Sequence, residues 1–364
     1  MKRTLLALSA FTFICAAISA QDSPLWLRKN AISPDGEQVA FAYKGNIYVV
    51  ESDGGQARQI TSNPAYDTDP LWSPDGESII FASYRNKSKD IYRIPATGGA
   101  PVRLTSHPGN ETPMTVLEDG SVIFSASIQQ DARYGDFPGG SQIYMIGPEG
   151  GRPEMVTSMQ ISNMSVRLDN TVIYEDYKGY EDPLRKHHTS SVTRDIWMYV
   201  PSIDPSEGFR IDGNGTFTKL TSFNGEDRNP VFELGGNAYY YLSEQDGTLN
   251  IYYTDSLADQ LFNGGSIKSK QITFYKGNPV RYLSISHNGT LCYSYDGELY
   301  TIKSGGQPEK VNIRIVTDQI EKESEIQTLT SGATRMAISP EGKEIAITAR
   351  GDVFVTSIDY KTTQ

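Results

Sequence analysis

A group of basic side chains stands out in an otherwise acidic chain. It comprises Arg185, Lys186, His187, His188 and Arg194, which fall within ten positions, together with Arg133 further upstream. Such cations can hold an anionic group, for example the C-terminal carboxylate of a peptide. Arg185 and Arg194 could instead order their own loop by pairing with the acids beside them, Glu181, Asp182 and Asp195. The sequence leaves both hypotheses open.

The sequence offers no framework for bond-making chemistry. It contains no Gly-x-Ser-x-Gly elbow and no His-Glu-x-x-His motif. His187 and His188 are adjacent, so in an extended segment they point apart and could not easily share a metal. The stretch from Asp212 to Thr216 resembles a calcium loop but lacks the distal acid, and we interpret it as a turn. We therefore predict no catalytic residue, no metal and no cofactor. The sequence does not exclude a catalytic set assembled from residues of separate repeats.

The composition indicates the fold class and argues against some classes of binding partner. The chain has 364 residues, 38% of them hydrophobic and 10% aromatic, with 33 Gly and 22 Tyr. This excess of tyrosine, glycine and turn residues over strong helix formers favours an all-β protein. The formal net charge of −11 argues against nucleic acid and anionic membranes as partners, because phosphate groups would be repelled.

The first twenty residues have the character of a secretory signal peptide. Lys2 and Arg3 precede a short apolar run that ends in small residues at Ser19-Ala20. We therefore predict export across the inner membrane, to the periplasm. No other apolar run approaches the ~18 residues that cross a bilayer, so no membrane span is expected. Beyond residue 20 only Cys292 remains, which excludes an internal disulfide.

A repeat with four markers runs through the remainder of the chain. The first marker is a turn, seen as Ser-Pro-Asp-Gly at 33–36 and 73–76 and in variant form at 117–120, 168–170, 234–236, 286–289 and 339–342. A β-rich run follows each turn, for example at 38–43 and 78–83. The second marker is Asp-Ile-Tyr or a close variant, at 46–48, 90–92, 142–144, 195–197, 250–252, 298–300 and 352–354. The third is a Gly pair. The fourth, expected inside the closing strand, is an apolar residue followed by Thr, as in Ile60-Thr61 and Leu104-Thr105.

These markers predict a β-propeller. Each unit reads as strand, turn, strand, loop, strand, Gly turn and strand, and the spacing of roughly 40–65 residues suits a four-stranded blade. A single blade cannot bury both faces of its sheet, whereas radial stacking buries them.

Two loops on one predicted face are much longer than their counterparts. They are 127–141 in the third unit, which carries Arg133, and 176–193 in the fourth unit, which carries the other basic residues except Arg194 just beyond it. Long loops on a rigid scaffold often bind ligands, although tolerated surface insertions would look the same. Their position in neighbouring units favours a shared binding surface.

The markers resemble the PD40 (WD40-like) repeats of TolB and of tricorn-type proteases. The stretch from Tyr180 to Trp197 is similar to the fourth blade of secreted bacterial tricorn-like peptidases of the S41 class. The resemblance implies a six-bladed propeller followed by a second propeller and a serine peptidase core. Residues 1–20 would be the signal peptide, 21–316 the six-bladed propeller, 317–332 a linker and 333–364 the incomplete first blade of a second propeller.

The resemblance also implies a function. The family's catalytic residues would lie beyond Gln364, so none can be assigned here, and the propeller would guide or select peptides for that core. The expected partners are peptides or unfolded protein segments and the chain's own C-terminal domains, with an oligomer also open. One alternative is a stand-alone TolB-like module that binds proteins. A single propeller of seven units is disfavoured by the long linker, and an enzyme acting on sugars lacks a distinctive acid pair.

Overall fold

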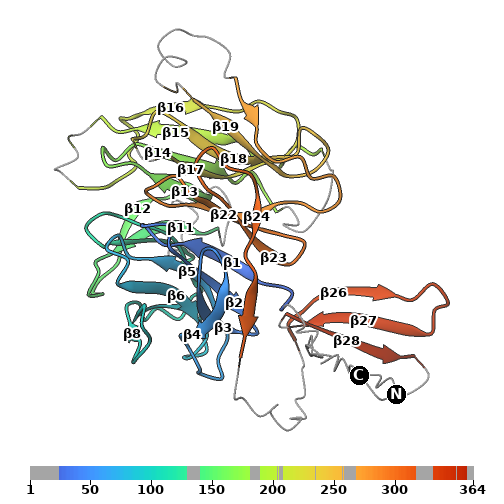
Figure 1. Cartoon of the computed structure of the whole chain (residues 1–364). Helices are drawn as coiled ribbons and strands as arrows, with labels where there is room; N and C mark the ends of the chain where they lie inside the picture. The colour runs from blue at the N-terminus through green and yellow to red at the C-terminus, as the bar shows by residue number, and fades with distance from the viewer. Residues whose placement is uncertain are drawn as a thin grey trace, which may run out of the picture. The chain divides into compact units, whose positions relative to one another are not determined.

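The computed structural model describes residues 24–128, 140–180, 189–202, 204, 208–233, 235–255, 257, 268–316, 331–349 and 351–358. Contacts between residues divide the chain into two units, Met1–Val316 and Thr317–Gln364. The first unit contains six β-sheets and the second contains one (Figure 1).

Each sheet of the first unit contains an antiparallel blade of four strands that follow one another along the chain, and the sheet of blade 1 has a fifth strand described below. Blade 1 comprises β1 (Arg28–Ile32), β2 (Gln38–Tyr43), β3 (Asn46–Glu51) and β4 (Gly55–Gln59). Blade 2 comprises β5 (Asp67–Trp72), β6 (Ser78–Ser83), β7 (Asp90–Pro95) and β8 (Val102–Arg103). Blade 3 comprises β9 (Glu111–Val116), β10 (Val122–Ala126), β11 (Gln142–Ile146) and β12 (Glu154–Thr157).

The other three blades repeat this order. Blade 4 comprises β13 (Ile161–Val166), β14 (Val172–Asp176), β15 (Ile196–Val200) and β16 (Thr216–Lys219). Blade 5 comprises β17 (Asp227–Phe232), β18 (Tyr239–Ser243), β19 (Asn250–Thr254) and β20 (Lys270–Gln271). Blade 6 comprises β21 (Arg281–Ile285), β22 (Leu291–Tyr295), β23 (Glu298–Ile302) and β24 (Glu309–Lys310). The all-β propeller fold predicted from the repeat is therefore confirmed.

The Ser-Pro-Asp-Gly marker forms a hydrogen-bonded turn between the first two strands of a blade. In blade 1 the Ser33 hydroxyl donates to Asp35 Oδ1 at 2.6 Å, and the same carboxylate oxygen accepts from the Glu37 amide at 3.0 Å. Ser33 Oγ also accepts from the Gln38 amide at 2.8 Å. These side-chain bonds satisfy backbone donors that the turn would otherwise leave unpaired.

The Ile-Thr marker joins the outermost strand to the third strand. The Thr61 hydroxyl accepts from the Ile47 amide at 2.9 Å, and equivalent bonds recur in blades 2, 4 and 5. The outer strand of blade 1 ends at Gln59, before this marker, because the threonine side chain replaces the next backbone bond. The marker therefore lies just after the strand in four of the five blades that have it.

Six hydrophobic clusters fill the spaces between neighbouring blades. Phe81 of blade 2 packs with Ile47 of blade 1, for example, and both are fully buried. The cluster between blades 6 and 1 contains Phe41 and Leu299, also fully buried. Because every blade shares a cluster with the next and the last shares one with the first, the six blades form a closed ring.

A further strand closes the ring at its outer edge. β25 (Ile313–Ile315) pairs in parallel with β4 and gives blade 1 a fifth strand. Closer to the axis, Asn30 Nδ2 of blade 1 donates to the Tyr282 carbonyl of blade 6 at 2.8 Å. Residues more than 250 positions apart thus hold the first and last blades together.

The second unit contains one three-stranded antiparallel sheet. It comprises β26 (Ala333–Ile338), β27 (Glu344–Ala349) and β28 (Asp352–Ser357). Its first turn repeats the blade pattern, since the Glu344 amide donates to Ser339 Oγ at 3.1 Å. Its β26 side chains are exposed, unlike those of the innermost strands in the first unit.

Candidate binding site at the axis of the propeller

The innermost strands each carry a β-bulge near their beginning. In blades 1, 2, 5 and 6 the bulge places one residue in the left-handed region, at Lys29 (φ 52°), Asp69 (φ 53°), Asn229 (φ 49°) and Tyr282 (φ 57°). This conformation is unfavourable for residues other than glycine, so its recurrence at four equivalent positions indicates a feature that the ring imposes.

Lys29 connects three blades through its bulge. Its ammonium lies 2.8 Å from Asp69 of blade 2 and 5.2 Å from the ring centroid of Tyr282 in blade 6. Lys89 also approaches Asp69, at 3.8 Å. Burial alone would raise the pKa of Asp69, but the two ammonium groups outweigh it and hold that pKa below its usual value. The Lys29 side chain is nevertheless 42% exposed, so this charged group is open to solvent at the axis.

Three arginines precede the bulge in neighbouring blades. They are Arg228 of blade 5, Arg281 of blade 6 and Arg28 of blade 1. Burial lowers the pKa of Arg281, and the positive charges of Arg228 and Arg28 lower it further. The three arginines therefore occupy the position just before the bulge in three consecutive blades, and the charges of Arg228 and Arg28 act on Arg281.

One of these arginines retains an unused donor. Arg228 Nε lies 2.6 Å from Glu226, yet its Nη2 is buried and has no hydrogen-bond partner among the described residues. The side chain is only 11% exposed. A buried donor without a partner is costly to the folded state.

Glu175 organises the blade 4 side of the axis. This carboxylate is 1% exposed and receives a bond from Arg194 Nη1 at 2.5 Å. Its other oxygen accepts from Asn163 Nδ2 at 2.9 Å and from the Asn229 amide at 3.1 Å. Arg194 also lies over the Tyr177 ring, 5.4 Å from its centroid. These contacts fix the base of the long blade 4 loop.

Arg194 is thus the only predicted site residue that the structure describes. Its guanidinium pairs with Glu175 rather than with Asp195, whose carboxylate instead contacts Lys178 and Lys219. The remaining predicted residues lie outside the described residues: Arg133, Arg185, Lys186, His187 and His188. Their assignment to peptide binding stays a prediction.

The cations at the bulge were not predicted from the sequence, although the sequence carries a signal for the bulge itself. In blades 2 and 5 the left-handed residue is an Asp or Asn directly before a proline, as in Asp69-Pro70 and Asn229-Pro230. Asp and Asn tolerate this backbone conformation better than most residues, and the following proline restricts it. The recurring pair at the start of a predicted innermost strand indicates a bulge.

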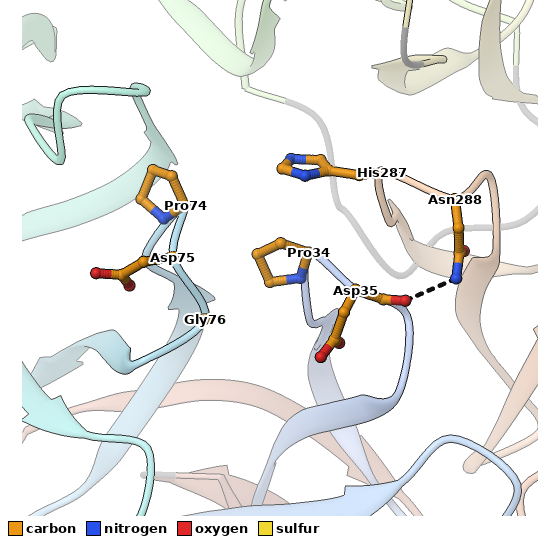
Figure 2. Close-up of a pocket in the computed structure, with 7 residues that line it drawn as sticks. All are labelled: Pro34, Asp35, Pro74, Asp75, Gly76, His287 and Asn288. Carbon is orange, nitrogen blue, oxygen red and sulfur yellow. Dashed lines mark hydrogen bonds between the residues drawn. The ribbon is translucent and has the colours of Figure 1, made fainter.

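The opposite end of the innermost strands borders a hollow of about 440 Å³. The first turns of three blades line it, as Figure 2 shows: Pro34 and Asp35, Pro74, Asp75 and Gly76, and His287 and Asn288. Asn288 Nδ2 donates to the Asp35 carbonyl at 2.6 Å, which ties the turn of blade 6 to that of blade 1. Both ends of the axis therefore present polar groups on a rigid frame.

The described residues offer binding groups rather than a metal-binding set. No group of three or more His, Cys, Asp or Glu side chains in the described part of the chain could hold a metal ion. Within the same residues, no helix is both long and apolar enough to span a membrane. The arrangement can hold an anionic group through arginine donors at one end of the axis.

Six four-stranded blades closed into a ring, with charged side chains at the axis, define a β-propeller. The model of the tricorn protease N-terminal β-propeller domain matches residues 24–308. The chain belongs to that family.

Individual relatives and solved structures share the fold. The chain is 22% identical over 226 residues to a tricorn protease homolog of Saccharolobus solfataricus, which covers 59% of this chain and 18% of that protein. The crystal structure of the tricorn protease superposes with a TM-score of 0.62 at 19% identity, covering 94% of this chain and 31% of that one. The crystal structure of TolB from Acinetobacter baumannii gives a TM-score of 0.53 at 18% identity, covering 78% of this chain and 66% of that one. The chain thus spans less than a third of the tricorn proteins that it matches.

Proposed function

We propose that this chain is the non-catalytic propeller portion of a tricorn-like serine peptidase of the S41 class, and that it guides or selects peptides for a catalytic core C-terminal to it. Membership of the tricorn N-terminal propeller family supports the first part. The proposal includes export by the N-terminal signal peptide to the periplasm.

The observation that supports peptide binding is the equivalent position of Arg28, Arg228 and Arg281, each just before the bulge of its innermost strand in three consecutive blades, on a chain of net charge −11. A peptide presents a terminal carboxylate, which arginine donors bind in bidentate fashion. The basic residues predicted in the long loops, Arg185 among them, are proposed as further contacts for the same peptide.

Peptide binding without hydrolysis tests the proposal. The purified chain is incubated with fluorescent peptides of five to ten residues, and anisotropy and mass spectrometry follow binding and cleavage. We expect saturable binding with no cleavage, weakened by Arg281→Gln and by Arg185→Ala. Cleavage by this chain, or the absence of binding at every peptide tested, would contradict it.

A stand-alone module that binds folded proteins is the second candidate. It is favoured by the complete closure of the first unit, whose blades 6 and 1 are joined by hydrogen bonds and by β25. This candidate predicts that folded partners bind the chain while short peptides do not. The same anisotropy experiment therefore separates the two functions.

A further inference from the structure

Two junctions between neighbouring blades bring a pair of acids together at the start of an innermost strand. At the junction of blades 2 and 3, the Glu111 amide donates to the Lys89 carbonyl at 2.8 Å. The Thr105 hydroxyl donates to Glu111 Oε2 and accepts from the Ile91 amide at 2.9 Å. These bonds link Glu111 to the residues on either side of Asp90, so the two acids lie close together across the junction.

The junction of blades 4 and 5 has the same arrangement. The Asp227 amide donates to the Arg194 carbonyl at 3.0 Å. The Thr221 hydroxyl, which interacts with the Asp227 carboxyl group, accepts from the Ile196 amide at 2.9 Å. Because Arg194 and Ile196 flank Asp195 in the chain, Asp227 and Asp195 form a second acid pair between blades.

The two acids of each pair differ in their surroundings. The marker acids, which begin the Asp-Ile-Tyr marker or its variant, are Asp90 and Asp195. The strand acids, which begin β9 and β17, are Glu111 and Asp227. Each marker acid has a cationic partner, which is Arg103 at 2.9 Å for the first and Lys219 at 2.8 Å for the second. The marker acids are therefore stabilised in their ionised form.

The strand acids are buried without such a partner. Glu111 is 0% exposed and Asp227 is 1% exposed, and no ion pair with either occurs among the described residues. In the same part of the chain, Glu111 Oε1 and both carboxyl oxygens of Asp227 lack a hydrogen-bond partner of good geometry. A buried carboxylate needs a counter-charge or several donors, whereas a protonated carboxyl group does not. The geometry therefore favours the neutral form of both strand acids.

The charged groups around Glu111 act in the same sense. Burial raises the pKa of Glu111 to about 7, and the negative charge of Asp90 on β7 raises it further. Three groups oppose this change: the Thr105 hydroxyl, the Arg103 guanidinium on β8 and the His107 amide. The neighbouring strand β10 carries no charged residue. Burial thus outweighs the groups that favour ionisation.

Asp227 has comparable surroundings. Burial raises the pKa of Asp227 to about 7, and the negative charges of Asp195 and Glu226 raise it further. The hydroxyl groups of Ser243 and Thr221 lower it by a smaller amount. The tyrosines of β18 and β19 that interact with it have pKa values raised by burial, so they stay neutral: Tyr239, Tyr241 and Tyr252.

The junction of blades 1 and 2 offers a comparison within the same chain. The Asp67 amide donates to the Gly45 carbonyl at 2.9 Å, as the strand acids do at the other two junctions. Asn46 takes the place of the marker acid, and Asp67 pairs with Arg85 at 2.8 Å. This junction therefore keeps the shared backbone bond without an acid pair.

We propose that each acid pair holds one proton, on the strand acid, and that the two junctions loosen when rising pH removes it. The proton passes to solvent and leaves two buried carboxylates facing each other between the blades. Their repulsion and desolvation favour a state in which the start of β9 or β17 separates from the preceding blade and water reaches the acid. The propeller would thus contain two pH-sensitive junctions among blades that otherwise pack alike.

Both junctions lie at the base of a long loop. The strand acid of blade 3 pairs with Ala126, the last residue before the loop at 127–141. The amide of the strand acid of blade 5 binds the carbonyl of Arg194, just after the loop at 176–193. Loss of the protons would therefore loosen the bases of the two loops for which the sequence predicts ligand binding. The device itself does not depend on what those loops bind.

Hydrogen exchange of the junction amides at several pH values tests the proposal. The full wild-type chain is exchanged between pH 5.5 and pH 8, and mass spectrometry of peptic fragments gives the rates, corrected for the intrinsic pH dependence of amide exchange. We expect the protection of the Glu111 and Asp227 amides to fall by about tenfold or more over this range, while that of the Asp67 amide stays constant. Constant protection at all three junctions, or an equal decrease at all three, would overturn the proposal.

Variants with a permanently neutral group give a second readout. Glu111→Gln should remove the pH dependence of exchange at the junction of blades 2 and 3 alone, and Asp227→Asn should remove it at the junction of blades 4 and 5 alone. In each variant the unaltered junction is the matched control, and the Asp67 amide reports any general loss of stability. Persistence of the pH dependence at the altered junction would contradict a proton on the strand acid. The wild-type series decides the proposal even if a variant does not fold.

Discussion

The ammonium of Lys29 in blade 1 lies 2.8 Å from the carboxylate of Asp69 in blade 2, and both residues occupy the left-handed position of a β-bulge. This ion pair joins two innermost strands at the axis, where neither residue could reach the other without the ring. The Coulombic attraction of Asp69 raises the pKa of Lys29, so the pair stays charged throughout the physiological pH range.

Removing the carboxylate should destabilise the propeller modestly. Asp69→Asn leaves Lys29 and Lys89 facing each other without a counter-charge. Because Lys29 is 42% exposed, solvent screens much of this repulsion, and we expect a loss of about 1 kcal/mol in the free energy of unfolding. Urea denaturation measures it. Adding Lys29→Met to Asp69→Asn should recover part of the lost free energy of unfolding. A further decrease in that free energy would contradict the pairing.

Arg194 should be a structural residue whatever its part in binding. Arg194→Ala leaves the Glu175 carboxylate, which is 1% exposed, without its cationic partner. Breaking a buried pair in this way should cost about 3 kcal/mol. Lys219→Ala is the matched control, since Lys219 contacts Asp195 from a side chain that is 42% exposed and should contribute little. Equal stability of the two variants in thermal unfolding would contradict the role assigned to Arg194.

Two buried acids should make the propeller less stable as the pH rises. Burial raises the pKa of Glu111 and of Asp227 to about 7, from ordinary values of 4.5 and 3.8. A folded state that binds protons more tightly than the unfolded state loses stability as pH increases through the folded pKa. The stabilisation from these groups is therefore complete below about pH 4 and is lost by about pH 8.

Asp227→Asn isolates this contribution. Asp195 and Glu226 add negative charge near Asp227, and the variant removes the ionisation that they oppose. We expect the urea midpoint of the wild type to fall from pH 5.5 to pH 8, and that of the variant to fall less. A midpoint that rises over this range in the wild type, or an identical slope in both proteins, would show that Asp227 does not titrate there.

Closure of the ring should depend on a glycine in blade 1. A Cβ at Gly54 would meet the Asn312 carbonyl oxygen at 2.8 Å, in the segment that leads into β25. Gly98 occupies the equivalent turn of blade 2, also has a positive φ, and has no atom within 4 Å of such a Cβ. Gly54→Ala should therefore lower the melting temperature more than Gly98→Ala. Equal losses would mean that only backbone strain matters and that β25 contributes little.

The strands were largely predictable because their patterns are local. The runs at 38–43 and 78–83 became β2 and β6 with the predicted bounds, and the Asp-Ile-Tyr marker opens β7. The marker Ile60-Thr61 was expected inside the closing strand but follows it, because a side-chain hydroxyl takes over a backbone bond. Three-residue β25 has no local pattern long enough to be recognised.

The axial site could not be predicted in the same way. Arg28 and Arg281 are separated by most of the propeller in sequence, and only the closed ring brings them together. The long-loop cations were more conspicuous because they are clustered along the chain. The equivalent positions across blades depend on ring closure, which the pattern within one blade does not specify. Asp69-Pro70 and Asn229-Pro230 signal the bulge in only two of the blades.

Binding of one peptide in two chemical forms tests the central claim most directly. Fluorescence anisotropy compares a heptapeptide with a free C-terminal carboxylate and the same peptide amidated, each with wild-type protein and with Arg281→Gln. We predict that amidation weakens binding to the wild type by about tenfold, or ~1.4 kcal/mol, and that Arg281→Gln reduces this difference. Equal affinity of the two peptides for the wild-type chain would contradict a carboxylate-binding role for the axial arginines.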